Sequence, residues 1–142
     1  MAVVNPLSDP EQPHIAMLIE QAFQGLRRDL GGDEPMPGLR VSHLRVLSHV
    51  PAHGISVTDL AAQAGMTKQA MGQFATYLVG AGYLVEDSDP GDRRVRVLNL
   101  SPCGREVTRA IGVRMQQVEE QWSQRVGTQR YATFRAVLAE LG

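Results

Sequence analysis

The sequence predicts a mainly α-helical protein that carries one small β-hairpin, and three features of the chain lead to this prediction. Apolar residues recur at the spacing of amphipathic helices through most of the 142 residues. Residues 56–82 contain capping residues and glycines that divide two short helices. Residues 83–100 contain two runs of strand-forming residues with a turn-rich segment between them. A chain of this length is expected to form one compact subunit.

The two short helices are predicted from their caps. The Ser56 hydroxyl can accept a free backbone N–H at a helix start, and Asp59 completes the capping-box pattern. Gly65 supplies the positive φ that ends this helix, and Thr67 is a natural cap for the next one. A helix, a glycine turn and a second helix form the motif that places the second helix in a DNA major groove. The expected buried stripes are Leu60, Ala61 and Ala64 in the first helix, and Met71, Phe74 and Leu78 in the second.

The hairpin follows directly. A strand is expected from Tyr83 after the helix ends at Gly82, residues 88–92 (SDPGD) form the turn, and residues 95–100 alternate as a returning strand. On that strand Val95, Val97 and Asn99 share one face, and Arg96, Leu98 and Leu100 share the other. The tip carries adjacent arginines, which indicates an anionic partner such as the minor groove beside a docked helix.

The run DPGDRRVRVLNLSPCG, preceded by GYL and the helix-turn-helix, resembles the wing signature of MarR-type winged helix-turn-helix transcriptional regulators. The resemblance covers nearly the whole chain. It implies a single subunit over residues 1–142, with a DNA-binding part at about 40–100 and dimerisation helices at about 9–31 and 101–142. The implied function is sequence-specific binding of double-stranded DNA by a homodimer, most often a repressor of a pseudo-palindromic operator. Release by a small-molecule effector is a further expectation for such a protein.

The flanking helices agree with this organisation. The first is expected to begin near Asp9, with Pro10 and Pro13 in its first turn, and to stop at Gly31 and Gly32. A second helix is expected at about residues 42–50. Long amphipathic helices at both ends have apolar faces that one small winged domain cannot cover, so burial against a second copy is expected.

On the C-terminal side, Ser101 is predicted to cap a helix with Pro102 at its first position. This helix is expected to run for about 25 residues, longer than most helices in a domain of this size. Gly127 closes it, and Thr128 is expected to cap a final helix.

The residues expected to contact DNA lie on the exposed side of the second short helix. Gln69 and Gln73 are one turn apart and can address neighbouring base edges, where a glutamine amide pairs bidentately with adenine. Thr67 and Lys68 at the helix start are better placed for phosphates. Gly72 costs about 1 kcal/mol of helix propensity relative to alanine, which suggests a close approach of the backbone to another group. The alternative is an ordinary solvated helix face. The complete set is Thr67, Lys68, Gln69, Gly72, Gln73 and Thr76.

At the hairpin tip, the resemblance implies that Arg94 enters the minor groove and that the Asp92 carboxylate holds it in position. Arg93 is expected to contact phosphate or nothing. The alternative is a charged, solvent-exposed hairpin without a DNA role. The overall charge does not favour nucleic acid, since the formal net charge is −1. Affinity would therefore depend on a few contacts and on dimerisation, and a winged-helix adaptor that binds protein instead of DNA remains an alternative.

Cys103 departs from the family pattern, in which a basic or polar residue is usual at this position. Because Cys103 is the only thiol and is expected at a helix start, a thiol-based redox-responsive regulator is a further alternative. A lone cysteine excludes an intrachain disulfide framework and fits a reducing cytoplasm. The chain start lacks the pattern of a signal peptide, and no membrane span is expected.

Four residues are candidates for effector binding by the same resemblance: His14, Met17, Phe23 and His43. Trp122 and Met115 are weaker candidates, and a core or dimer contact is an alternative role for each. His49 and His53 do not complete a zinc ligand set, so neither a metal nor a cofactor is expected. The absence of a phosphate loop, a GxSxG motif or paired carboxylates predicts a protein that is not an enzyme.

Overall fold

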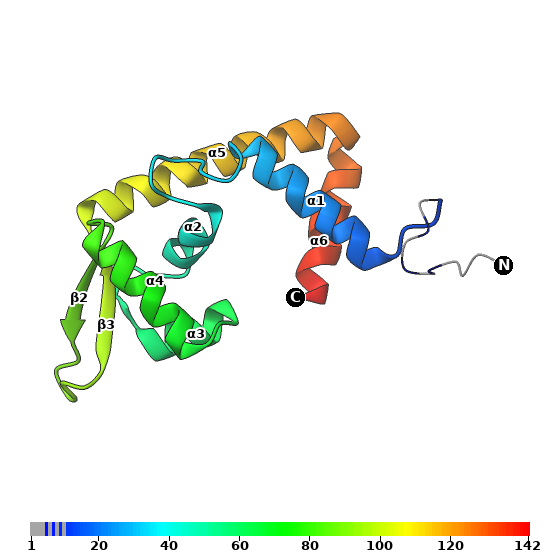
Figure 1. The fold of residues 1–142 in the computed structure, drawn as a ribbon. Coiled ribbons are helices and arrows are strands. Elements are labelled where there is room, and N and C mark those ends of the chain that lie inside the picture. Colours follow the sequence, from blue (N-terminus) through cyan, green and yellow to red (C-terminus); the bar gives the residue numbers. More distant parts are fainter. Residues whose placement is uncertain (1–4, 6, 8, 10) are drawn as a thin grey trace.

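The computed structural model describes residues 5, 7, 9 and 11–142, and within them the chain forms six helices and three short strands (Figure 1). The predicted mainly α-helical fold with a small hairpin is confirmed. The elements are α1 (Ile15–Asp29), α2 (Val41–Ser48), β1 (Ile55–Ser56), α3 (Val57–Ala64), α4 (Lys68–Gly80), β2 (Leu84–Ser88), β3 (Arg96–Leu100), α5 (Pro102–Val126) and α6 (Thr128–Leu141).

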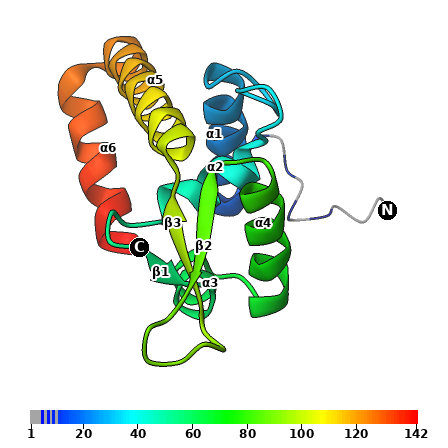
Figure 2. The same ribbon diagram turned by 90° about the vertical axis from the view of Figure 1, so that its left-hand side faces the viewer.

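The sheet is antiparallel with strand order β1-β3-β2, so β3 lies in the middle (Figure 2). The hairpin pairs Leu84 with Leu100 and continues to Ser88 opposite Arg96. The prediction of a two-stranded hairpin was incomplete, because β1 adds a third strand that pairs Ile55 with Leu98. Two residues are too few to show the alternation by which strands are recognised in a sequence.

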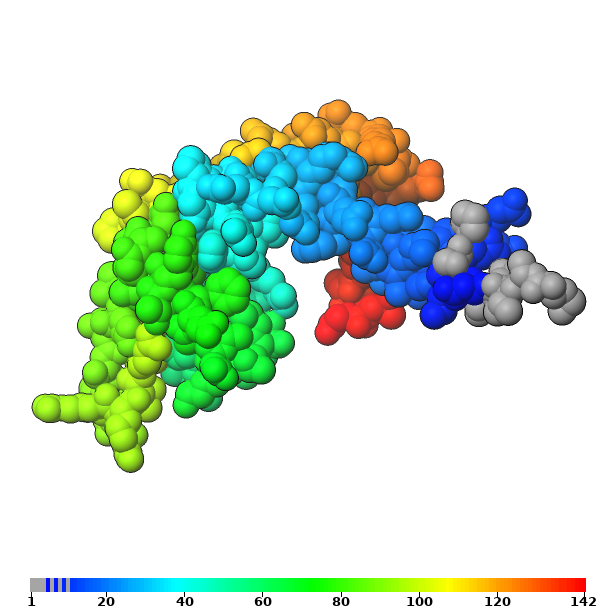
Figure 3. All heavy atoms as spheres, viewed as in Figure 1, coloured from blue at the N-terminus to red at the C-terminus, as the bar shows by residue number. Residues whose placement is uncertain are grey.

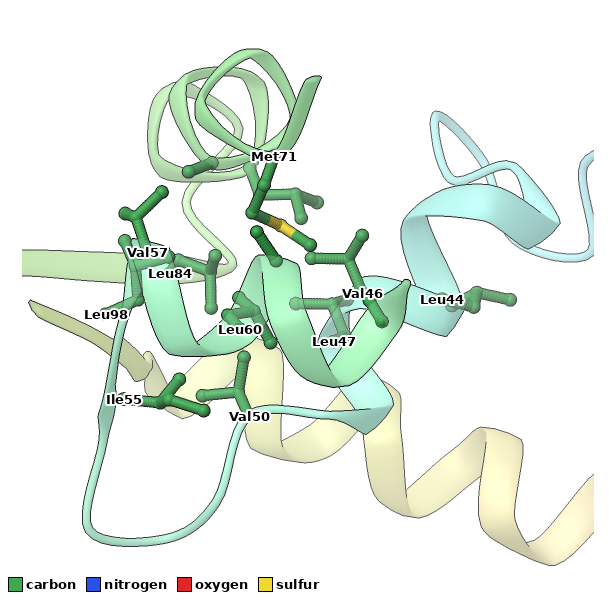
Figure 4. Close-up of a cluster of buried hydrophobic side chains, with 14 of the residues drawn as sticks. Leu44, Val46, Leu47, Val50, Ile55, Val57, Leu60, Met71, Leu84 and Leu98 are labelled. Carbon is green, nitrogen blue, oxygen red and sulfur yellow. The ribbon is translucent and has the colours of Figure 1, made fainter. Parts of the chain in front are cut away.

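The hydrophobic core lies inside residues 39–100, called the winged part from here on. Side chains from α2, α3, α4 and the sheet meet there (Figure 4). Leu60, Met71 and Leu98 have no exposed surface, and the predicted stripe residue Phe74 is partly buried against this core. The winged part therefore has a complete core of its own.

The helix α5 extends the structure away from the sheet. Ser101 caps it by accepting a hydrogen bond from Gly104 N–H at 3.0 Å, as predicted. A Cβ at position 104 would collide with the Tyr83 carbonyl oxygen, so only glycine permits this packing of α5 on the hairpin base. In the space-filling view α5 forms the top of an arch, with the winged part on one side and the terminal helices on the other (Figure 3).

Two predicted helix starts were wrong. The first helix begins at Ile15 with His14 as its cap, because the Asp9 carboxylate accepts the Glu11 N–H and forms a local turn that competes with the helix. Pro13 precedes the helix, and Pro10 lies outside the described residues. Thr128 is the first helical residue of α6 and not its cap. Gly127, at φ 98°, ends α5 and starts α6, which leaves no separate capping position.

Candidate DNA-binding surface

The helix α4 is held at a defined angle to α3 by the residues predicted to do so. Ser56 Oγ accepts the Asp59 N–H at 3.1 Å, and Thr67 Oγ1 accepts the Ala70 N–H at 3.1 Å. Gly65 adopts the left-handed conformation with φ 64° between the helices. Helix α4 buries one face in the core and leaves the opposite face to solvent, where Thr67, Lys68, Gln69, Gln73 and Thr76 are exposed and Gly72 is half-buried.

Sequence reasoning missed a contact that supports this turn from behind. The Arg45 guanidinium, from α2, donates through Nη2 to the carbonyl oxygen of Ala64 at 2.7 Å. This carbonyl belongs to the last residue of α3, where backbone acceptors lack helical partners. Arg45 therefore fixes the end of α3 and the turn that leads into α4. No pattern in the sequence marks this long-range contact.

The hairpin tip, which extends away from the helices (Figure 2), brings Asp92 and Arg94 together. Asp92 Oδ1 accepts the Arg94 backbone N–H at 3.0 Å and the Arg94 Nε–H at 3.3 Å. The Arg94 side chain is nevertheless 91% exposed, so its guanidinium remains available. Asp89 shapes the turn by accepting the Gly91 N–H at 2.7 Å. Arg93 is exposed beside this pair.

A second ion pair, also missed by sequence reasoning, joins the two hairpin strands between their middle and the turn. Arg96 donates from Nε and Nη2 to the two carboxylate oxygens of Glu86, the latter at 3.1 Å. The hydrogen bond to Arg96 lowers the pKa of Glu86, and the same bond raises the pKa of Arg96. The sequence contained a signal for this pair. The alternation of β3 places Arg96 on the same inward face as Leu98, and a cation there needs a carboxylate partner nearby.

A crevice separates α1 from the winged part. Phe23 and Phe74 contribute rings to its lining. The charged residues in the lining are Arg27, which pairs with Asp33, together with Glu34, Arg40 and Arg45. Of the predicted effector residues, only Phe23 lies in this lining; His14 and Met17 are at the opposite end of α1.

His43 lies behind the crevice in an aromatic cluster. Its ring stacks on Tyr77 at 4.5 Å between centroids and meets Phe74 edge-on at 5.6 Å. Its Nδ1 accepts the Arg40 backbone N–H at 3.0 Å, which caps α2. Burial, and secondarily the charge of Arg40, lower the pKa of His43. The histidine thus has a structural role at the start of α2.

The remaining sequence candidates have simple surroundings. Cys103 is exposed at the second position of α5. His49 caps the end of α2, and His53 is exposed. Across the residues that the structure describes, no group of three or more His, Cys, Asp or Glu side chains is arranged to hold a metal ion. No helix in this part of the chain has both the length and the apolar character that crossing a bilayer needs.

An exposed polar helix after a tight glycine turn, with a β wing beside it, defines a winged helix-turn-helix protein. Residues 38–95 match the model of the MarR family. This match covers the winged helix-turn-helix of the chain and agrees with the resemblance found in its sequence. No curated protein sequence matches the chain.

Solved structures with the same fold extend over both parts of the chain. The PcaV transcriptional regulator from Streptomyces coelicolor, in complex with its natural ligand, has a TM-score of 0.72 and 22% identity, covering 99% of this chain and 96% of that one. A probable transcriptional regulator from Pseudomonas aeruginosa has a TM-score of 0.76 and 21% identity, covering 91% and 97%. A mutant MarR from E. coli, complexed with operator DNA, has a TM-score of 0.76 and 17% identity, covering 89% and 92%. At these identities the likeness establishes a shared fold.

Proposed function

We propose that this protein is a cytoplasmic, homodimeric repressor that binds a pseudo-palindromic operator in double-stranded DNA. The observation that carries the proposal is the exposed Arg94 guanidinium held by Asp92 at the end of a wing that stands beside α4. An exposed arginine on a protruding hairpin, next to a polar helix, fits the simultaneous reading of a minor groove and the adjacent major groove. The related E. coli MarR mutant has been crystallised with operator DNA, which supports the same use of this fold.

Each residue then has a distinct role in the proposal. Gln69 and Gln73 address base edges in the major groove. Thr67 and Lys68 meet phosphates at the start of α4, where the helix dipole favours an anion. Gly72 and Thr76 have small side chains that allow a close approach to the helix surface. The Thr76 hydroxyl donates a hydrogen bond to the Gly72 carbonyl oxygen at 2.9 Å and therefore does not project from the helix. Arg94 enters the minor groove, with Arg93 on the phosphates beside it.

The terminal helices supply the second half of the proposal. Their exposed apolar side chains include Ile15 and Phe23 of α1 and Leu138 and Leu141 of α6. Burial of these side chains against a second copy would give the two-fold symmetry that a palindromic operator requires. Half-sites are then expected about one helical turn, 10–10.5 bp, apart.

The experiment is a gel shift of the purified protein against the DNA upstream of its own gene, repeated at several salt concentrations. A saturable shift that weakens steeply with salt is expected. The substitution Arg94→Ala should weaken the shift and reduce the salt slope by about one, whereas Arg109→Ala, an exposed arginine of α5, should leave both unchanged. A parent protein that binds no DNA but retains a protein partner would favour the adaptor alternative.

We also propose that an anionic aromatic effector occupies the crevice between α1 and the winged part. Its lining contains two aromatic rings, and three arginines outnumber the two carboxylates of Asp33 and Glu34, which fits a ligand with a ring and an acid group. The related NadR was crystallised in complex with 4-hydroxyphenylacetate. Thermal-shift measurements with that acid should show stabilisation of the parent and less of Phe23→Ala. Peroxide should weaken DNA binding through Cys103 only if the redox alternative is correct, and Cys103→Ser is its control.

A further inference from the structure

We propose that Glu86 and Arg96 form a positioning pair that holds the wing at a fixed distance from α4, so that major- and minor-groove contacts form together. Neither residue is assigned a direct contact with DNA. The inference rests on the proposed function, and one of its tests does not require DNA.

The sheet register places both residues on the inward face. Glu86 lies opposite Leu98, and Arg96 lies opposite Ser88. Because alternate residues of a strand share a face, Arg96 and Leu98 point to the same side of the sheet. Leu98 is fully buried there, so the pair lies where the buried part of the hairpin ends and its projecting part begins. A two-stranded hairpin is only marginally stable without packing, so contacts at this point set the direction of the tip.

The pair reaches helix α4 at Gly72. A Cβ built at Gly72 would lie 3.7 Å from Arg96 Nη1, which is ordinary van der Waals distance. Gly72 is on the face of α4 that also carries Gln69 and Gln73. The guanidinium of Arg96 therefore spans the space between the wing and the DNA-facing helix, while Glu86 anchors it to β2. This contact also explains why a glycine is suited to position 72, since a long side chain would displace the guanidinium.

Charge and exposure separate this pair from the wing-tip arginine. The side chains of Arg96 and Glu86 are 38% and 33% exposed, whereas Arg94 is 91% exposed. The Glu86 carboxylate engages two guanidinium nitrogens of Arg96, and the pair has no net charge. It therefore adds little attraction for phosphate, and its contribution to binding is geometric.

The first test compares two substitutions that remove the same charge from neighbouring positions of β2. Glu86→Gln breaks the pair, whereas Asp87→Asn leaves it intact because Asp87 lies on the other face, opposite Val97. The probe is the duplex that the parent protein selects from a randomised library. Electrostatics alone predicts tighter binding for both variants. Positioning predicts that Glu86→Gln instead raises the Kd about fivefold, the upper range for a partly exposed ion pair. Equal or tighter binding by Glu86→Gln, or equal weakening by both variants, would overturn the proposal.

The second test exchanges the charges. The double variant Glu86→Arg with Arg96→Glu restores an ion pair at the same place, so it should recover most of the affinity that Arg96→Glu alone loses. If Arg96 contacted DNA directly, the exchange would give no recovery, and the positioning role would be wrong.

The third test measures the wing without DNA. Spin labels on Arg93→Cys and Gln63→Cys, both exposed positions, are introduced in a Cys103→Ser background. The distance distribution should broaden with Glu86→Gln and stay narrow with Asp87→Asn. Equal distributions would overturn the proposal even if the parent binds DNA. If the distance distribution broadens with Glu86→Gln but the parent protein selects no duplex from the library, the proposed DNA-binding function is wrong and the positioning of the wing by this pair is not.

Discussion

The winged part and the terminal helices differ in how far they bury their apolar side chains. From Leu39 to Leu98 the winged part encloses a continuous core. The helices α1 and α6 contain no buried residue, and Ile15 and Leu141 are 70% and 79% exposed. The difference teaches that the first region buries its apolar side chains within one chain, whereas those of the second stay exposed in the single subunit and are available for the proposed dimer.

The contacts that α5 makes with α1 and with the loop after it also leave the terminal helices uncovered. The contacts between the C-terminal half of α5 and α1 include the hydrogen bond from Trp122 Nε1 to Asp29 at 2.8 Å. Arg114 likewise donates to the Pro35 carbonyl at 3.1 Å. Directional bonds of this kind fix orientation, but each contributes little net stability. The terminal helices are thus oriented by the subunit but not covered by it.

The largest expected effect comes from comparing one leucine in each region. Leu60→Ala should lower the free energy of unfolding by about 2–5 kcal/mol, since it opens a cavity in a fully packed core. Leu138→Ala, in α6, should have a loss that grows with protein concentration, because in the proposed dimer its burial depends on the second copy. Urea unfolding at several protein concentrations measures both. If Leu138→Ala caused a large loss of unfolding free energy at every protein concentration, the two regions would not differ in this way.

The next effect concerns association itself. Phe134→Glu combined with Leu138→Glu should reduce the mass in light scattering from about twice 15.5 kDa to that of one subunit, since two charges in an apolar interface are costly to bury. Val85→Glu is the matched control, because Val85 is as exposed as Leu138, at 46%, but lies in the wing. A parent protein that runs as a single subunit contradicts the proposed dimer.

A smaller effect separates the helix from the wing within the DNA-binding surface. Gln73→Ala should relax sequence preference at one position of each half-site, where a bidentate base contact is worth about 1–3 kcal/mol of discrimination. Selection from a randomised library before and after the change measures this preference. Gln63→Ala, an exposed glutamine of α3, provides the control. Unchanged preference with Gln73→Ala would remove this residue from the reading surface.

Local sequence signals predicted most of the winged part because its elements are set by short-range rules. Ser56, Gly65 and Thr67 each act within four residues, and the hairpin turn is specified by its own residues. The pairing of Asp92 with Arg94 was instead implied by the family resemblance, and the two residues are hydrogen-bonded in the structure. The predicted start of α1 lay too early in the chain. The prolines permit a helix start there, but the Asp9 side chain forms a local turn that competes with it.

Contacts between distant segments were not predictable in this way. The bond from Arg45 to Ala64 joins residues 19 apart, and Glu86 to Arg96 joins strands through a register that the turn alone did not determine. The strand β1 is defined only by its partner β3. Such features depend on tertiary packing, which overrides or supplements local preference.

The smallest expected effect concerns His43, whose ring packs against Phe74 and Tyr77 in the winged part. Because burial and Arg40 lower the pKa of His43 in the folded protein, the unfolded chain takes up the proton at higher pH. The stability due to neutral His43 is therefore complete above about pH 6.5 and is lost as the pH falls toward the lowered pKa of the folded state. His43→Asn keeps an acceptor for the Arg40 N–H but does not titrate, so its free energy of unfolding should decline less between pH 7 and pH 5. Chemical unfolding of both proteins across this range measures the difference. Identical pH profiles would show that His43 does not contribute to the pH dependence of the free energy of unfolding.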